Sequence, residues 1–333
     1  MAPPKLPLVP PKGVFVPSPT FFLPASAAAS EKALQAPVDT KTQIEHTLFL
    51  ARAGITGLTL LGSTGEAVHL SRTERKDLTV AVRKGLEDGG FPDYPIMAGV
   101  LTNGEIEETL EWLHDYAEAG AQWGLVLTPG YFGPAVSQEG LVKWYQIIAD
   151  KSPIPIMIYN YPGVTNNVQV LPETYRVLAK HPNIVGCKMS HGNVSHHIQV
   201  SLDPSIDHDN FRVYSGFGNQ LGPIVAFGAA GVIDGMAAFY PKTVVRLMTL
   251  MLQEEKTAET WAEIHRLQYA VSQGEEFVMR SGILGIKEAV FRVTGFGNMD
   301  GGRLPIPGHL PDGAWDKAKG LFLDDIQATE SSL

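Results

Sequence analysis

The stretch Ile184-Val185-Gly186-Cys187-Lys188-Met189 is the most informative part of the chain, because it places a lysine inside a short apolar run. A run of this length and composition predicts a buried strand. A lone ammonium group is costly to bury, so a lysine here needs a functional or an electrostatic reason. A structural reason is available too, since the amine could reach the strand end or pair with a buried carboxylate.

Two other apolar runs end in residues of complementary chemistry. Gly57–Leu61 is followed by Gly62-Ser63-Thr64-Gly65-Glu66, and Ile154–Ile158 is followed by Tyr159-Asn160-Tyr161-Pro162. An amine, a phenol and a Gly/Ser/Thr turn, each on or just after a strand, together favour covalent catalysis by an amine. Taken singly, the turn could be an ordinary strand–helix connection, and Tyr159 could be an aromatic residue at a barrel rim.

The strand that carries Lys188 belongs to a series of eight strand–helix units with a spacing of about 30 residues. The series predicts an α/β protein with a (β/α)₈ barrel, the TIM-barrel fold, over residues 13–254. A doubly wound open sheet would have fewer strands and a glycine-rich fingerprint after the first strand, which this chain lacks. The expected strands are Val14–Val16, Leu58–Leu61, Pro95–Val100, Trp123–Leu127, Ile154–Tyr159, Ile184–Met189, Arg212–Ser215 and Gly231–Ile233.

The segments outside the barrel differ from it in composition. Residues 1–12 form a proline-rich arm, and residues 255–333 are expected to form a C-terminal helical region. Phe21–Ala29 faintly resembles a secretion signal, but proline interrupts it and no charged segment directly precedes it, so we interpret it as a strand end and a loop. In the C-terminal region, helices are expected near 257–271, 276–293 and 312–327.

Composition limits the partners and the compartment. The net charge of -9 and the absence of any basic run make nucleic acid and anionic membranes poor partners. No apolar run reaches the ~18 residues that a membrane span needs. The single cysteine, Cys187, excludes an internal disulfide and favours a reducing, cytoplasmic location. Because Cys187 precedes Lys188 on a strand, it should face the opposite side and pack in the core.

The reaction open to these residues is imine formation. Burial lowers the pKa of a lysine, and the neutral amine can attack a ketone to give an imine that accepts electrons when a C–C bond breaks. A tyrosine hydroxyl can relay the proton, and the Gly62–Gly65 turn can bind a carboxylate. No cofactor is required, and no metal is expected because His196 and His197 are adjacent and point apart. His191 could contact the substrate or lie in a solvated loop.

In order and spacing, Gly62-Ser63-Thr64-Gly65-Glu66, Tyr159-Asn160-Tyr161-Pro162 and Gly186-Cys187-Lys188 resemble the signatures of the dihydrodipicolinate synthase / N-acetylneuraminate lyase family. The likeness covers residues 13–300 or thereabouts. It implies a (β/α)₈ barrel with C-terminal helices, usually a homotetramer, that binds pyruvate as a Schiff base.

The resemblance also implies roles for individual residues. Lys188 would form the imine and Tyr159 would relay the proton. Ser63 and Tyr131 would extend the relay, with Tyr131 reaching into the site of a neighbouring subunit. The expected substrate-binding residues are Thr64 with the backbone of Gly62 and Gly65 for the pyruvate carboxylate, and Gly216, Ile233 and Val164 for the pocket wall.

Val164 marks a departure from the family pattern. Dihydrodipicolinate synthases carry an arginine two residues after the Tyr-Asn-x-Pro proline, where it binds the carboxylate of the second substrate, and an apolar residue cannot replace it. The wider sequence resembles fungal 2-keto-3-deoxy-L-galactonate aldolases, which release pyruvate and L-glyceraldehyde, a neutral hydroxyaldehyde. The alternatives are a dihydrodipicolinate synthase or 4-hydroxy-2-oxoglutarate aldolase of the same family, a metal-dependent aldolase, and a non-catalytic barrel.

Overall fold

The computed structural model describes residues 9–24, 34–300, 302–306 and 308–333. Most of the proline-rich arm and the Ala25–Ala29 part of the signal-like segment therefore lie outside the described residues. Among the described residues, no helix has both the length and the apolar character needed to cross a membrane.

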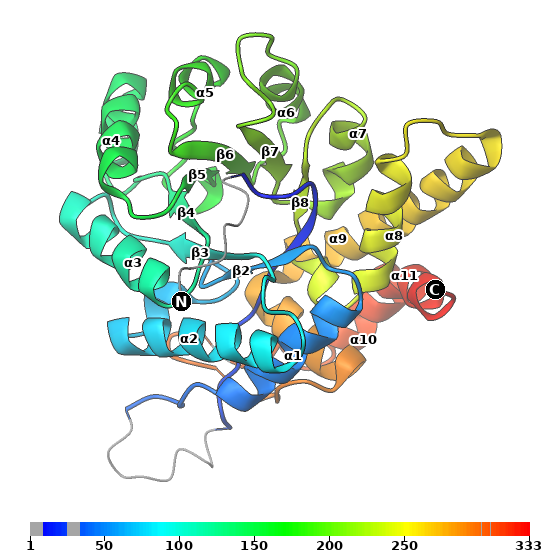
Figure 1. Ribbon diagram of the computed structural model, residues 1–333. Helices are drawn as coiled ribbons and strands as arrows, with labels where there is room; N and C mark the ends of the chain where they lie inside the picture. The colour runs from blue at the N-terminus through cyan, green and yellow to red at the C-terminus, as the bar shows by residue number, and fades with distance from the viewer. Residues whose placement is uncertain (1–8, 25–33, 301, 307) are drawn as a thin grey trace.

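Eight parallel strands close into one barrel, so the predicted TIM-barrel fold is confirmed (Figure 1). Each strand pairs with its sequence neighbours, and the first pairs with the last through Gly13 opposite Gly231. The strands are β1 (Gly13–Pro17), β2 (Gly57–Leu60), β3 (Ile96–Val100), β4 (Trp123–Leu127), β5 (Ile156–Asn160), β6 (Ile184–Met189), β7 (Arg212–Ser215) and β8 (Gly231–Ile233).

Helices follow the strands and surround the barrel (Figure 1). The second helix begins with a capping box, in which the side chains of Ser71 and Glu74 each accept a hydrogen bond from the other's backbone N–H. The helices are α1 (Thr40–Arg52), α2 (Arg72–Asp88), α3 (Ile106–Glu118), α4 (Gln138–Lys151), α5 (Pro172–Leu178), α6 (Val194–Ser201), α7 (Leu221–Val225) and α8 (Pro241–Met251).

The register between β5 and β6 places the two key side chains together. Tyr159 lies opposite Lys188 in the parallel ladder, so both point to the same side of the sheet. Tyr159 belongs to the cluster of side chains inside the barrel, with Phe15, Met157 and Tyr214. Cys187 faces the other way and is fully buried in the core between barrel and helices, as predicted.

The C-terminal region differs from the prediction in one respect. Instead of two helices separated near residue 274, a single element, α9 (Ala258–Thr294), runs through that position and is interrupted at Gly282, where φ is 57° and ψ is -147°. Gly274 does not break the helix. It allows close packing, since a Cβ there would lie 2.3 Å from the sulfur of Met236.

The chain ends in a nearly continuous helical stretch. It consists of α10 (Ala314–Ala318), a π-helical turn η7 (Lys319–Leu323) and α11 (Asp324–Ser331). Both α9 and α11 contact α8, and α9 also contacts the short 3₁₀ turns that follow β7 and β8, namely η5 (Gly218–Gln220) and η6 (Met236–Ala238). The added helices thus reach the end of the barrel where the strands finish, which is the usual place of a TIM-barrel active site.

Candidate active site

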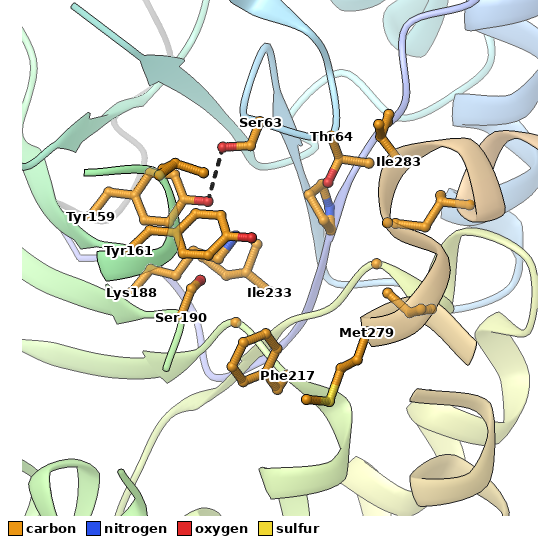
Figure 2. Close-up of a pocket in the computed structure, with 17 residues that line it drawn as sticks. Ser63, Thr64, Tyr159, Tyr161, Lys188, Ser190, Phe217, Ile233, Met279 and Ile283 are labelled. Carbon is orange, nitrogen blue, oxygen red and sulfur yellow. Dashed lines mark hydrogen bonds between the residues drawn. The ribbon is translucent and has the colours of Figure 1, made fainter. Parts of the chain in front are cut away.

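A cavity of about 390 Å³ opens at the C-terminal ends of the strands (Figure 2). Its inner part contains the amine, the phenol and the hydroxyls that the sequence singled out. Its outer part is largely apolar. The residues that line it are Pro17, Ser63, Thr64, Tyr159, Tyr161, Val164, Lys188, Ser190, Gly216, Phe217, Ile233, Gly235, Val278, Met279, Gly282, Ile283 and Ile286.

Lys188 lies at the inner end of this cavity and is only 5% exposed. Its Nζ is 4.6 Å from the centre of the Tyr159 ring. Burial lowers the pKa of Lys188 to about 7, against the opposing effect of Asp234 and Glu275. Gly216 gives the side chain room, because a Cβ there would lie 3.1 Å from the Lys188 Cε. A neutral amine is therefore available near neutral pH, as a nucleophile for a ketone requires.

Tyr159 presents its hydroxyl to two serines. Its oxygen lies 3.3 Å from the Ser63 Oγ, and it also interacts with Ser190. Burial raises the pKa of Tyr159 to about 12, so the phenol stays protonated at neutral pH. The ring of Tyr161 stacks on that of Tyr159, with the centres 5.8 Å apart. A protonated phenol bonded to a serine can accept one proton while it donates another.

The loop that carries Ser63 and Thr64 has a strained backbone at both ends. Leu61 and Glu66 have φ values of 57° and 51°, in the left-handed region that side chains rarely adopt. Ser63 and Thr64 line the cavity, whereas Gly62 and Gly65 do not. Gly65 shapes the loop instead, since a Cβ there would lie 2.8 Å from the Leu61 nitrogen.

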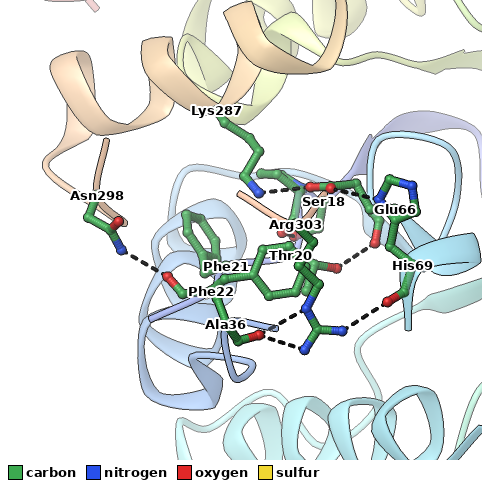
Figure 3. A network of polar contacts seen from close by, with 12 residues as sticks. Ser18, Thr20, Phe21, Phe22, Ala36, Glu66, His69, Lys287, Asn298 and Arg303 are labelled. Atoms are coloured by element: carbon green, nitrogen blue, oxygen red, sulfur yellow. Dashed lines mark hydrogen bonds and ion pairs between the residues drawn. The ribbon is translucent and has the colours of Figure 1, made fainter. Parts of the chain in front are cut away.

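A buried ion pair anchors the same loop from the C-terminal region (Figure 3). The Lys287 Nζ on α9 lies 2.7 Å from the Glu66 Oε1, and both side chains are less than a tenth exposed. The other Glu66 oxygen lies 3.3 Å from the His69 Nδ1. Arg303 adds a second contact from the C-terminal region: its guanidinium donates hydrogen bonds to the carbonyls of Ala36 and His69. The loop that carries Ser63 and Thr64 is thus held by residues more than two hundred positions later in the sequence.

Replacing Lys287 with methionine should lower the free energy of unfolding by about 3 kcal/mol, because it leaves the Glu66 carboxylate buried without its cation. Adding Glu66→Gln should recover part of the loss, because the buried charge is then removed. The measurement is denaturant unfolding. As a control, Lys84→Met breaks an exposed pair with Asp88 and should cost less than ~0.5 kcal/mol. Equal effects of the Lys84 and Lys287 changes would contradict the anchoring role.

Tyr131 does not reach the cavity of its own chain. Its side chain is 69% exposed and packs edge-on against the exposed ring of Phe132, with ring centres 5.1 Å apart. Asn166 holds the turn by donating to the carbonyls of Gly130 and Tyr131. The expected contribution of Tyr131 to a neighbouring subunit's site remains a prediction.

His191 is not among the residues that line the cavity. It packs against His197, with ring centres 5.0 Å apart. Within the described part of the chain, no group of three or more His, Cys, Asp and Glu side chains is arranged to hold a metal.

The sequence left several pocket residues unassigned. Ser190 follows Lys188 by two positions on the same side of the strand, and this spacing could have revealed it. Phe217 follows Gly216 and gave no signal. Met279 and Ile283 come from α9, where an apolar residue at helical spacing is indistinguishable from a core residue (Figure 2).

Known proteins are similar to this chain in both sequence and fold. The chain matches the model of the Dihydrodipicolinate synthetase family over residues 30–306. It is 32% identical over 302 residues to an L-threo-3-deoxy-hexylosonate aldolase of Hypocrea jecorina, covering 89% of this chain and 90% of that protein. It is 33% identical over 293 residues to a protein of Emericella nidulans named "Probable 4-hydroxy-2-oxoglutarate aldolase, mitochondrial", covering 87% of each.

A solved structure agrees over the whole barrel. A dihydrodipicolinate synthase family protein from Coccidioides immitis superposes with a TM-score of 0.81 at 27% identity, covering 98% of this chain and 99% of that one. The family match spans most of the chain, and it includes the loop that carries Ser63 and the strands that carry Tyr159 and Lys188. The chain therefore belongs to the dihydrodipicolinate synthetase family.

Proposed function

We propose that the protein is a class I aldolase that cleaves a 2-keto acid into pyruvate and an aldehyde through an imine on Lys188. The observation that carries the proposal is a buried amine with a pKa lowered to about 7, placed beside the Tyr159 phenol at the barrel mouth. Homologues named as aldolases support the reaction class.

The site supplies the groups that each step needs. The Lys188 amine attacks the keto carbon, and the adduct loses water to give a protonated imine. Tyr159 accepts the proton of the C4 hydroxyl and donates its own to the Ser63 oxygen as the C3–C4 bond breaks, and the electron pair moves to the imine to form an enamine. The relay then runs in reverse and returns one proton to C3. Protonation at C3 and hydrolysis release pyruvate and free the lysine. Thr64, which lines the cavity, would hold the pyruvate carboxylate together with the backbone around it.

The second half of the substrate should be neutral. Of the described residues that line the cavity, Lys188 alone has a charged side chain, and the imine uses it. Val164 lies at the cavity and is half exposed, so no guanidinium binds a distal carboxylate there. These observations, with the aldolases of Hypocrea jecorina and Aspergillus niger as relatives, support 2-keto-3-deoxy-L-galactonate as substrate, with L-glyceraldehyde as the aldehyde product.

The outer wall of the cavity favours a second candidate. Phe217 and the α9 residues Val278, Met279 and Ile283 form an apolar surface opposite the amine (Figure 2). A hydroxylated chain would leave such a surface poorly matched, whereas an aldehyde with an apolar or aromatic substituent would cover it. The second candidate function is therefore cleavage of a 2-keto acid that yields an apolar aldehyde.

Substrate preference is expected to follow charge. The kcat/KM for 2-keto-3-deoxy-L-galactonate, or for an aryl-substituted 4-hydroxy-2-keto acid, should exceed that for 4-hydroxy-2-oxoglutarate by at least ~10-fold, since a buried carboxylate would lack a partner. Val164→Arg should reverse the order, whereas Val177→Arg, exposed on α5, should not. A wild-type preference for the dicarboxylate, or efficient condensation of pyruvate with aspartate semialdehyde, would exclude a neutral second half.

The test of the reaction class is trapping. Borohydride should inactivate the enzyme only when pyruvate is present, because only the imine is reduced. Inactivation that does not depend on pyruvate, or pyruvate without effect, would exclude the Schiff-base mechanism.

Assembly and compartment are further parts of the proposal. We expect a homotetramer in the cytoplasm, with small-molecule substrates and neither nucleic acid nor membrane as partners. The exposed pair of Tyr131 and Phe132 supports a contact between subunits. The reduced Cys187 suits the cytoplasm, whereas the Emericella nidulans relative carries "mitochondrial" in its name, so cell fractionation would decide.

A further inference from the structure

Two carboxyl groups are buried directly behind the wall of the cavity. Asp234 lies between the lining residues Ile233 and Gly235 and is fully buried. Its two oxygens accept the N–H groups of Met236 and Ala237 at 3.3 and 3.2 Å, at the start of η6. Both bonds come from one short turn, so the carboxyl group is held in a fixed orientation.

Glu275 meets Asp234 from the C-terminal region. It lies on α9, one turn before the lining residue Met279, and is 1% exposed. Its Oε2 accepts the N–H of Gly218 at 3.1 Å, while its Oε1 has no N–H or hydroxyl donor. Both carboxyl groups lie against Gly218, since Glu275 accepts its N–H and a Cβ there would lie 3.0 Å from the Asp234 Cγ, and the two side chains interact with each other. We refer to Asp234 and Glu275 together as the acid pair.

Two carboxyl groups in contact without solvent oppose each other's ionisation, which favours a proton shared between them. Burial first, and the neighbouring Asp234 second, raise the pKa of Glu275 well above its usual range. The Glu275 Oε1, which lacks any other donor, is available for the bond through the shared proton. A pair that shares one proton carries one negative charge, and the three N–H groups that it accepts would stabilise that charge.

The acid pair and Lys188 approach the same short segment after β7. A Cβ on Gly216 would lie 3.1 Å from the Lys188 Cε, and a Cβ on Gly218 would lie 3.0 Å from the Asp234 Cγ. Two glycines thus let the amine and the acid pair come close to one turn of backbone. Both carboxyl groups act electrostatically on Lys188 and favour its charged form.

Among the described residues, the other neighbours of Lys188 in the cavity lining are neutral. Tyr159 faces it from β5, and Ser190 follows it on β6. The acid pair is faced by backbone N–H groups of η5 and η6. The negative charge near the Lys188 amine therefore comes from Asp234, the residue after β8, and from Glu275 on α9.

We propose that the acid pair shares one proton and that its single negative charge is the fixed counterion that stabilises the cationic forms of Lys188, including the protonated imine. The part of this inference that concerns the imine rests on the proposed function. The part that concerns the free amine of Lys188 does not. Asp234 and Glu275 are positioning residues, because neither lines the cavity. A protonated imine is the electron sink of the reaction, so an anion placed behind it keeps the productive form populated.

The chain allows a variant series that separates charge from shape. In Glu275→Gln the remaining Asp234 keeps one negative charge, and in Asp234→Asn the remaining Glu275 keeps it. Only Asp234→Asn with Glu275→Gln removes the charge while the side chains stay nearly isosteric. A purely structural pair would be disturbed by all three variants to similar degrees, whereas a counterion is lost only in the double variant.

The first measurement is the pH dependence of Lys188 acetylation by acetic anhydride, followed by peptide mapping. This measurement reports on the free amine and does not require an imine. The apparent pKa of Lys188 should stay within ~0.3 units of wild type in each single variant and fall by about one unit in the double variant. The pH range over which pyruvate and borohydride trap the imine should move in the same direction. An unchanged pKa in the double variant, or equal shifts in all three, would overturn the inference.

The outcomes also distinguish this inference from the proposed function. If acetylation shows the shift but wild type forms no trapped adduct, the imine mechanism fails while the counterion stands. If the adduct forms but the pKa of Lys188 does not shift, the counterion role is excluded and the imine mechanism stands.

Should the double variant not fold, infrared difference spectroscopy still tests the shared proton. Wild type should show one protonated carboxyl band at about pH 7.5, and this band should disappear in either single variant. Absence of that band in wild type would overturn the inference that the acid pair shares a proton.

Discussion

Replacing Lys188 with methionine should abolish pyruvate release, with a loss of at least ~10⁴-fold in kcat, because the covalent route has no other nucleophile. The substitution keeps the length of the side chain and removes an amine that is costly to bury, so the barrel should fold. In wild type, borohydride with pyruvate should label the peptide that contains Lys188. Lys287, which is also a buried lysine, provides an internal control and should remain unlabelled.

The pH dependence of labelling gives a second, independent check. Burial lowers the pKa of Lys188 to about 7. The neutral amine therefore becomes more abundant as the pH rises through that value, and its abundance is constant above it. The rate of imine formation should rise between about pH 6 and 8 and then level off. A label on another lysine, or a rate that keeps rising to about pH 10, would show that Lys188 is not the nucleophile.

Removing only the hydroxyl of Tyr159, by Tyr159→Phe, should reduce kcat by at least ~10²-fold, the usual contribution of a positioned acid–base group. The ring stays in place against Tyr161 and Lys188, so the packing of the cavity is kept. The phenol oxygen is the atom bonded to Ser63, and its loss breaks the proton relay. Steady-state kinetics should show the effect mainly in kcat, with KM changed little.

A matched substitution controls for the loss of a buried phenol. Tyr116 is buried like Tyr159, at 1% exposed against 2%, but it lies on α3 away from the cavity. Tyr116→Phe should leave kcat within a few-fold of wild type. If Tyr159→Phe does the same, Tyr159 is a packing residue and the proton must travel by another route.

The barrel was predictable because each strand is encoded locally. The expected bounds of the strands Trp123–Leu127, Ile184–Met189, Arg212–Ser215 and Gly231–Ile233 are those observed. The start of β5 came two residues later than expected, at Ile156. Pro155 has no N–H for the ladder and contributes only its carbonyl, which accepts the N–H of Gly124.

The inner half of the site was predictable for a related reason. Parallel strands in a barrel finish at the same end, so residues at strand ends meet whatever their separation in sequence. Ser63, Thr64, Tyr159, Lys188, Gly216 and Ile233 came together in this way around one cavity, with Val164 at its edge. Gly62 and Gly65 lie behind the lining, and Tyr131 faces away from the cavity of its own chain.

The sequence by itself determined the closed barrel and the amine–phenol core, because alternation along a strand fixes which side chains share its inner face. Only the tertiary structure decided the path of α9, its interruption at Gly282, and the contacts of Lys287 with Glu66 and of Glu275 with Asp234. Helical periodicity shows that a face is buried but not what it is buried against. That choice depends on packing between distant segments, which local propensity does not encode.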